Sequence, residues 1–439
     1  MNTEKNKLEK QIEYLRARLA IAEDDVERLH HTIRDQNAEL RSMRYELAAA
    51  SRPPKKDENH LAPSASQSVQ PIKAQGLGTP IRLSKKTILI VDCTLPKYDR
   101  SAGARSLHAY MRLFLAMGYD VAFLPGDFDA PQPYAAELEA MGVLLLAGSY
   151  YEQHWHLWVE QNAGYLIAAI IRHLEAARRF MRFIKENSHA LILYFAINLE
   201  LFQGQDNTSP EQALTYIVAH DADMVLLFDE NQQHVLTERY GIKTALLPLY
   251  FYCDIPPRVT AYEETKGLLF VGAFSEKQNV DAVLWFIDEV LPLVRQALPG
   301  VPFSIVGANL PQDIRYRTDK NTLATENVTD EDLANYYRNC RVCVAPAIGN
   351  TGAKGKILEA MYYGVPLVSN RAGMAGLPGI EVVITPADSK EDFAAQVVQK
   401  YLNEREWQND IGKYRTYLRN YAAFGKVEKM FRGILEGSL

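Results

Sequence analysis

Apolar residues recur at alternating intervals of three and four along the first fifty residues. The spacing continues over residues 8–47 without Gly or Pro, and Glu, Arg, Lys and Asp are frequent at the flanking positions. A sustained heptad pattern predicts a coiled coil, and the alternative is a single amphipathic helix packed on its own globular body. β-branched residues at half of the a positions, with Leu at several d positions, favour a parallel dimer over a trimer. The a positions are Ile12, Leu19, Val26, Ile33, Leu40 and Leu47, and the d positions are Leu8, Leu15, Ala22, Leu29, Gln36 and Met43.

Residues 51–86 lack this periodicity. Pro, Ser and Lys dominate the start of the segment, and Gly76, Gly78 and Pro80 break any helix near its end. Such a composition predicts a flexible linker between a stalk, residues 1–50, and the rest of the chain.

From Thr87 onward, short apolar segments alternate with helical patterns. Apolar strands separated by helices are typical of a parallel sheet that is covered on both faces. The pattern restarts after Pro256 and Pro257, which predicts an α/β fold with two doubly wound Rossmann-like domains, residues 87–260 and 261–439. The predicted strands are Thr87–Asp92, Val121–Pro125, Leu144–Ala147, Leu166–Ile171, Leu191–Ala196, Met224–Phe228 and Thr244–Leu249 in the first domain, and Leu268–Gly272, Phe303–Val306, Val342–Ala345, Leu367–Asn370 and Val382–Thr385 in the second.

Composition narrows the class of protein. The 439 residues have a net charge of −6 and no basic tract, which argues against a nucleic-acid partner. Four cysteines do not make a disulfide framework, and Cys340 and Cys343 are expected to be buried thiols. The start of the chain lacks an apolar leader, and no apolar run has the length of a membrane span. A cytoplasmic location is therefore expected.

The most informative motif lies between the predicted strand at Val342 and a helix that begins near Ile357. Small residues and two lysines fill the turn, which includes Gly352, Ala353, Lys354, Gly355 and Lys356. A βα turn of this kind directs backbone N–H groups and the positive end of a helix at one point, and lysines add full charges, so phosphate is a fitting ligand. Glu359 follows Lys356 by one helical turn, where it can accept hydrogen bonds from a ribose. The competing interpretation is an ordinary connection with solvated lysines.

This segment resembles the donor-site signature of family-four retaining glycosyltransferases. The likeness runs from Gly352 through Glu359, Ala360, Met361 and Gly364 to Ser369, and continues upstream in Gly267–Phe274 and Ser304–Gly307. It is strong over residues 265–385, weaker over 87–260, and absent from the first 85 residues. It implies the GT-B fold, in which one C-terminal helix crosses back to the first domain.

The resemblance also implies a function. It implies transfer of a hexosyl or deoxyhexosyl group from a nucleotide diphosphate sugar to an acceptor, with retention and without metal or other cofactor. A cell-surface glycan is the expected acceptor, and polysaccharide biosynthesis the expected process. Lys356 would contact the diphosphate and Glu359 the ribose. The expected catalytic residues are Lys356, Glu200 and Arg105, and the expected donor-binding residues are Gly352, Ala353, Lys354, Gly355, Lys356, Glu359, Gly272, Lys277 and Gly103.

Several positions depart from the family pattern. Ala273 and Gln278 stand where members often have Arg and Lys, and Thr351 replaces the first glutamate of a Glu-x7-Glu pair. Asn198 and Glu200 fall where a histidine-containing string is expected. These departures keep a second hypothesis open, namely a non-catalytic glycosyltransferase-like scaffold assembled through its coiled coil. A nucleotide-sugar epimerase of similar shape is a third and weaker one.

Two other motifs have competing interpretations. Asp221 and Asp223 have the spacing of a metal-binding DxD motif, but a helix cap before a strand is the favoured interpretation, so no metal site is expected. The segment from His154 to Trp158 could line a sugar site, but a helix that packs in or on the body is favoured.

Overall fold

The computed structural model describes residues 82–99, 101–196, 210–349 and 354–437, all within one unit of the chain, Gly76–Leu439. The predicted coiled coil and most of the predicted linker lie outside these ranges. The end of that linker belongs to the body, because Leu83 is buried and its N–H donates to the side-chain oxygen of Asn162 at 2.8 Å. Among the helices described, none has the length and apolar character needed to span a membrane.

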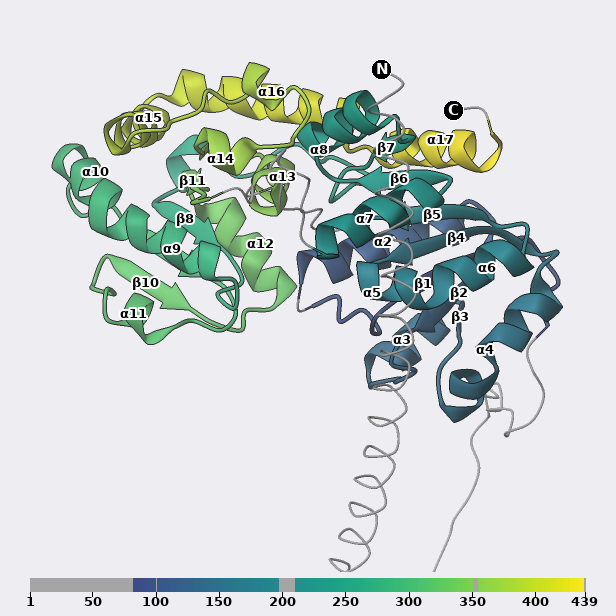
Figure 1. Cartoon of the computed structure of the whole chain (residues 1–439). Coiled ribbons are helices and arrows are strands. Elements are labelled where there is room, and N and C mark those ends of the chain that lie inside the picture. Colours follow the sequence, from purple (N-terminus) through teal and green to yellow (C-terminus); the bar gives the residue numbers. More distant parts are fainter. Residues whose placement is uncertain (1–81, 100, 197–209, 350–353, 438–439) are drawn as a thin grey trace, which may run out of the picture. The chain divides into compact units, whose positions relative to one another are not determined.

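The first domain is built on a parallel sheet of seven strands in the order β3-β2-β1-β4-β5-β6-β7 (Figure 1). The seven predicted strands of this domain are all present, with ends that differ by at most a few residues. The strands are β1 (Thr87–Asp92), β2 (Asp120–Pro125), β3 (Val143–Leu145), β4 (Leu166–Arg172), β5 (Leu191–Phe195), β6 (Met224–Leu227) and β7 (Thr244–Leu246). The helices are α2 (Ala102–Ala116), α3 (Tyr134–Ala140), α4 (Ser149–Asn162), α5 (Leu174–Ala176), α6 (Arg182–Asn187), α7 (Pro210–Asp221) and α8 (Glu230–His234), with π-helical turns at Ala177–Met181 and Val235–Arg239.

The central strand β1 explains why this sheet needs helices on both faces. All six of its residues are buried, and its four apolar residues alternate between two separate cores. Leu89 and Val91 pack with α4 through α7 and the π-helical turn Val235–Arg239, whereas Ile88 and Ile90 pack with α2 and α3. An apolar run without polar alternation therefore produced a strand covered from both sides.

The second domain has a smaller parallel sheet in the order β10-β9-β8-β11-β12. The strands are β8 (Leu268–Val271), β9 (Phe303–Val306), β10 (Thr322–Thr325), β11 (Val342–Val344) and β12 (Leu367–Val368). The helices are α9 (Lys277–Trp285), α10 (Leu291–Ala297), α11 (Gln312–Arg315), α12 (Asp330–Asn339), α13 (Lys354–Tyr362), α14 (Arg371–Met374), α15 (Lys390–Leu402) and α16 (Glu404–Tyr421), with a π-helical turn at Phe286–Val290 and short 3-10 helices at Tyr262–Glu264 and Ile380–Val382.

One predicted strand of the second domain is wrong. The segment Val382–Thr385 forms no strand; it begins at the end of a 3-10 helix, and Val382 is 86% exposed. The fifth strand is instead β10, which pairs with β9 in parallel from Thr322 to Thr325. Its sequence, Thr-Leu-Ala-Thr, has no apolar pattern that marks a strand: Thr322 is buried and Leu323 is 60% exposed, as an edge strand allows.

The last helix, α17 (Phe424–Leu435), packs on the first domain. Its residues Val427, Phe431 and Ile434 are buried in the core that contains Ile88, and the ring of Phe431 lies 4.9 Å from that of Phe114. In Figure 1 this yellow helix lies beside the first sheet. The chain therefore crosses back, as the resemblance implied.

Both sheets have a point at which the strand order reverses. In the first sheet, β1 lies between β2 and β4; in the second, β8 lies between β9 and β11. Ligands of open parallel sheets bind outside the carboxyl ends of the strands at such a point. The residues that follow β1, β4, β8 and β11 are therefore the ones to inspect.

Candidate functional site

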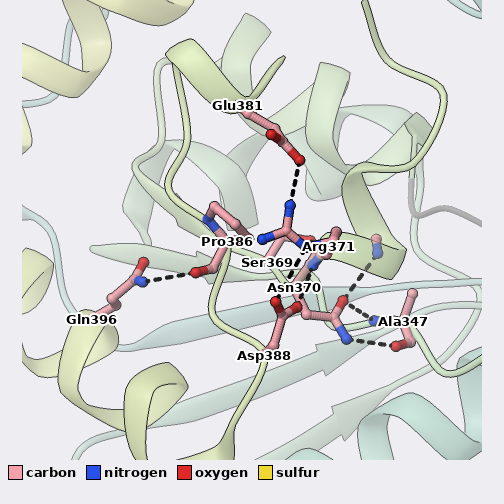
Figure 2. A network of polar contacts seen from close by, with 9 residues as sticks. Ala347, Ser369, Asn370, Arg371, Glu381, Pro386, Asp388 and Gln396 are labelled. Carbon is pink, nitrogen blue, oxygen red and sulfur yellow. Dashed lines mark hydrogen bonds and ion pairs between the residues drawn. The ribbon is translucent and has the colours of Figure 1, made fainter. Parts of the chain in front are cut away.

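Helix α13 follows β11 and lies at the switch point of the second sheet. Lys354, Gly355 and Lys356 form its first turn, while Gly352 and Ala353 fall outside the described residues. The chain leaving β11 is anchored by Asn370, whose side-chain amide accepts a hydrogen bond from the N–H of Ala347 at 3.0 Å and donates to its carbonyl oxygen at 2.8 Å (Figure 2). The same amide oxygen caps α14 by accepting from the N–H of Gly373. Asn370 therefore fixes the backbone that enters the predicted phosphate turn.

Lys356 extends from α13 toward the loop after β8. Its ammonium group donates to the side-chain oxygen of Asn279 and lies 4.9 Å from the centre of the Phe270 ring. A Cβ atom on Gly272 would lie 3.3 Å from Cε of Lys356, so the glycine gives this side chain room. Burial lowers the pKa of Lys356 to about 8. The site thus holds a partly desolvated cation whose described partner is a neutral amide.

Glu359 lies one turn further along α13 and is shared between the two domains. Its Oε1 accepts from Nη1 of Arg105 in α2 at 3.1 Å, and its Oε2 accepts from the hydroxyl of Tyr337 in α12 at 3.2 Å. The second guanidinium nitrogen of Arg105 lies 3.5 Å from Asp330. Burial raises the pKa of Glu359 in spite of the opposing charge of Arg105. Two residues expected at the site, Arg105 and Glu359, are therefore brought together.

Lys354 is also paired across the domains. Its Nζ lies 2.5 Å from Oδ2 of Asp229, which begins α8 and caps it by accepting the N–H groups of Asn231 and Gln232. Gly355 faces Tyr250, since a Cβ atom there would lie 3.3 Å from the phenol ring. Lys354 is thus neutralised by an acid, unlike Lys356.

The remaining expected residues fall in different places. Gly272 directly follows β8 and lies beside Lys356, but Lys277 is 84% exposed and pairs with Asp281 on the outer surface of α9. Asn279, two residues later, takes the position next to Lys356. Gly103 lies in the first turn of α2, and Glu200 and Asn198 lie outside the described residues.

The first domain contributes a polar cluster at its own switch point. Asp92 ends β1 and Arg172 ends β4, and their side chains form an ion pair with Nη1 and Oδ2 2.6 Å apart. His173 follows directly, with Nε2 3.5 Å from Oδ1 of Asp92 and a backbone φ of 64°. Positive φ is costly for a non-glycine residue and is found more often at functional sites. The sequence analysis missed His173, although its position just after a predicted strand was a usable signal.

The two doubtful motifs are structural. Asp223 pairs β5 with β6: its N–H donates to the carbonyl of Ile192 and its carboxylate accepts the N–H of Ile192 at 2.7 Å. This is the amino end of β6, opposite the edge that holds the site. Trp155 and Trp158 lie in α4, where Trp158 is buried and Trp155 packs on Phe180. Among the residues described, no cluster of three His, Cys, Asp or Glu could hold a metal, and all four cysteines are free.

Comparison with known proteins finds a family match within the second domain. Residues 265–403 match the family described as glycosyl transferases group 1. This group 1 segment contains the whole second sheet and α13. A curated protein of Klebsiella pneumoniae, described as an uncharacterized 44.6 kDa protein in the cps region, is 26% identical over 118 residues, or 25% of this chain and 30% of that protein. The chain thus matches less than a third of that relative's length.

Solved structures extend the likeness to both domains. The pneumococcal O-GlcNAc transferase GtfA, in complex with UDP and GlcNAc, has a TM-score of 0.61 at 10% identity, covering 80% of this chain and 99% of that one. HepE of Anabaena, in complex with UDP and glucose, has a TM-score of 0.56 at 12% identity, covering 80% and 100%. Sucrose-phosphate synthase from Thermosynechococcus elongatus has a TM-score of 0.54 at 13% identity, covering 80% and 99%. At these identities the likeness shows the shared GT-B fold, and together with the group 1 segment it supports a glycosyltransferase.

Proposed function

We propose that this protein is a retaining, metal-independent glycosyltransferase of the family-four type, which transfers a hexosyl or deoxyhexosyl group from a nucleotide diphosphate sugar to a glycan. The observation that carries the proposal is the position of Lys356, at the switch point of the sheet in the group 1 segment and at the start of a helix. Cation and helix terminus together suit a diphosphate.

The reaction explains why such a group is needed. Breaking the anomeric C–O bond leaves an oxocarbenium-like sugar and places growing negative charge on the departing nucleoside diphosphate. A fixed cation and the N–H groups of a helix start stabilise that charge without a metal. The family's usual Arg and Lys are replaced by Ala273 and Gln278, and Lys356 reaches the loop after β8 from α13 instead. We propose that Lys356 takes over their role.

Glu359 is proposed to bind the ribose. Both of its oxygens have protein partners, Arg105 and Tyr337, so a ribose must share or replace one of them. Arg105 is the movable partner because its side chain is 39% exposed, and on release it would face the diphosphate. His173 and Glu200 are proposed to act on the sugar and acceptor side in the first domain.

Calorimetry with UDP and UMP tests the donor site, since UDP is the nucleotide in the GtfA and HepE complexes. Glu359→Ala should weaken both nucleotides by a similar factor, because both contain the ribose. Lys356→Ala should weaken UDP much more than UMP. Glu326→Ala, which removes a partner of Arg315 away from α13, is the matched control and should change neither. Unchanged affinity in both site variants would reject the assignment.

A second candidate function is a non-catalytic scaffold. It is favoured by one observation: Glu359 and Lys354 are already satisfied by residues of the first domain, Arg105 and Asp229. A screen of nucleotide sugars separates the two candidates. Nucleotide sugar consumed with the anomeric configuration of the product retained, as read by NMR, supports the enzyme. Lack of binding at millimolar concentration supports the scaffold.

Assembly and location complete the proposal. We propose that residues 8–47 join two chains as a parallel coiled coil, that the protein acts in the cytoplasm, and that it serves polysaccharide biosynthesis. Sedimentation of the full chain against a chain lacking residues 1–75 tests the first point. The shortened chain should run as a monomer and bind UDP as the full chain does. A monomeric full chain would direct attention to a separate partner for the heptads.

A further inference from the structure

A buried ion pair lies beneath the first turn of α2. The side chains of Arg172 and Asp92 are only 4% and 8% exposed, and they come from the carboxyl ends of the neighbouring strands β4 and β1. Burial lowers the pKa of Arg172. Removing two charges from water costs several kcal/mol per ion, so such a pair gives little net stability. A contribution beyond stability would explain its position.

The contacts of the pair point to α2. Nη2 of Arg172 donates to the carbonyl oxygen of Gly103 at 3.3 Å, and a Cβ atom on Gly103 would lie 3.6 Å from that same nitrogen. Gly103 is the second residue of α2, and a cation beneath the positive end of a helix is unfavourable by itself. Asp92 offsets this charge, and its Oδ1 also accepts the N–H of Cys93 at 2.7 Å. The pair therefore contacts α2 within its first turn.

The start of α2 determines where Arg105 points. Ser101 caps the helix, and the N–H of Arg105 donates to the carbonyl of Ser101 at 3.0 Å. Arg105 lies two residues beyond Gly103 and reaches Glu359 in the other domain. A shift of the first turn would move Cα of Arg105, and the side chain would then have to leave its present rotamer to keep its contacts with Glu359 and Asp330.

We propose that Arg172 and Asp92 are positioning residues, which hold the first turn of α2 so that Arg105 meets Glu359 at the proposed donor site. This inference rests on the proposed function for its catalytic consequence but not for its structural one. It assigns a role to two buried residues that contact neither α13 nor the group 1 segment directly in the described contacts.

Hydrogen exchange measured by mass spectrometry tests the structural part. In Arg172→Met, amides of residues 102–106 should exchange at least about tenfold faster than in the wild type, since the carbonyl of Gly103 and the charge of Asp92 lose their partner. Arg172→Lys keeps a positive charge for Asp92 but loses the planar guanidinium that contacts both Asp92 and Gly103. Its exchange rates should therefore lie between those of the wild type and of Arg172→Met. Lys400→Met is the control: it breaks the equally buried Lys400–Asp410 pair, 10% and 5% exposed, at the far side of the second domain.

A double-mutant cycle tests the functional part. With UDP-glucose as the probe, Arg172→Met should lower turnover by about tenfold in the wild-type background but by less than about twofold in Arg105→Ala, because the positioned residue is already gone. Equal losses in both backgrounds would overturn the inference. So would exchange at residues 102–106 that matches the Lys400→Met control. If no nucleotide sugar is turned over, the exchange result still decides the structural claim, and only the proposed function fails.

Discussion

The two domains place a cation at equivalent points of their sheets but treat it differently. Arg172 is the last residue of β4, which pairs with β1 where the strand order of the first sheet reverses. Its charge is neutralised by Asp92. Lys356 lies at the reversal of the second sheet, and within the described residues it forms no ion pair, with only the amide of Asn279 as its hydrogen-bond partner. A buried cation that has its own acid is fixed in place, whereas one with a neutral partner retains charge for an incoming anion. The first domain thus holds its cation in a closed ion pair, whereas the second leaves its cation without an acid among the described residues.

Removing the unpaired cation should have the largest effect. Lys356→Ala is expected to weaken UDP binding by about 10- to 150-fold, since a charge-assisted contact contributes about 1.5–3 kcal/mol. Lys277→Ala, which removes an exposed lysine from the neighbouring helix, should change the affinity by less than about twofold. Titration calorimetry measures both. Equal losses of UDP affinity in the two variants would mean that binding depends on overall charge and not on the position of Lys356.

The pH dependence sharpens the same contrast. Because the pKa of Lys356 is lowered to about 8, the free protein loses this charge above that pH, and UDP affinity should fall about tenfold from pH 7 to pH 9. Stability should move the other way. In the unfolded chain Lys356 keeps its proton up to about pH 10.5. Its contribution to the free energy of unfolding therefore increases as the pH rises from about 8 to about 10.5. Lys356→Met should remove both trends, as measured by calorimetry and by denaturant titration.

The ion pair of Lys354 and Asp229 allows the opposite test, in which a neutralised lysine loses its acid. Asp229→Asn removes the acid that neutralises Lys354 and keeps an oxygen that can cap α8. If a paired cation becomes a ligand once its acid is gone, UDP should bind about two- to fivefold more tightly. Asp281→Asn, which frees the exposed Lys277, is the matched control and should leave affinity unchanged. Weaker binding in Asp229→Asn would show instead that the contact between the domains organises the site.

The smallest expected effect is that of metal removal. Since Lys356 and the start of α13 supply positive charge, EDTA should leave both UDP binding and turnover unchanged. Activity that is lost in EDTA and restored by Mn²⁺ or Mg²⁺ would contradict this prediction and call for a site outside the described residues.

The sequence predicted the secondary structure well where the apolar pattern was strong. All six residues of β1 are buried, and the sequence indicated that strand with its observed ends. The pattern failed at Val382–Thr385, where Val382 faces solvent and Ile384 is buried without any strand pairing, and at β10, where Thr322 is buried and Leu323 is exposed. Short segments at the edge of a sheet are decided by their neighbours, which a local pattern does not contain.

The site was predictable on one side only. The turn before α13 and Glu359 stand together in the sequence, so a local motif was enough to select them. Tyr337, Asp229 and Asp92 join the site through contacts between distant parts of the chain, and no local pattern marks them. Lys277 was expected to bind the donor, but it begins α9 with its side chain exposed, and Asn279 lies beside Lys356 instead.

The return of the chain to the first domain has a mechanical consequence. The outgoing segment at Tyr252 and the returning segment at Ala422–Phe424 lie side by side: the N–H of Tyr252 donates to the carbonyl of Ala422, and the N–H of Phe424 donates to the carbonyl of Tyr252, each at 2.9 Å. A single connecting segment would allow the two domains to rotate in every direction. Two connecting segments that are hydrogen-bonded to each other resist twisting of one domain against the other. Any opening between Arg105 and Glu359 would therefore have to bend both connecting segments together, because they are joined at Tyr252.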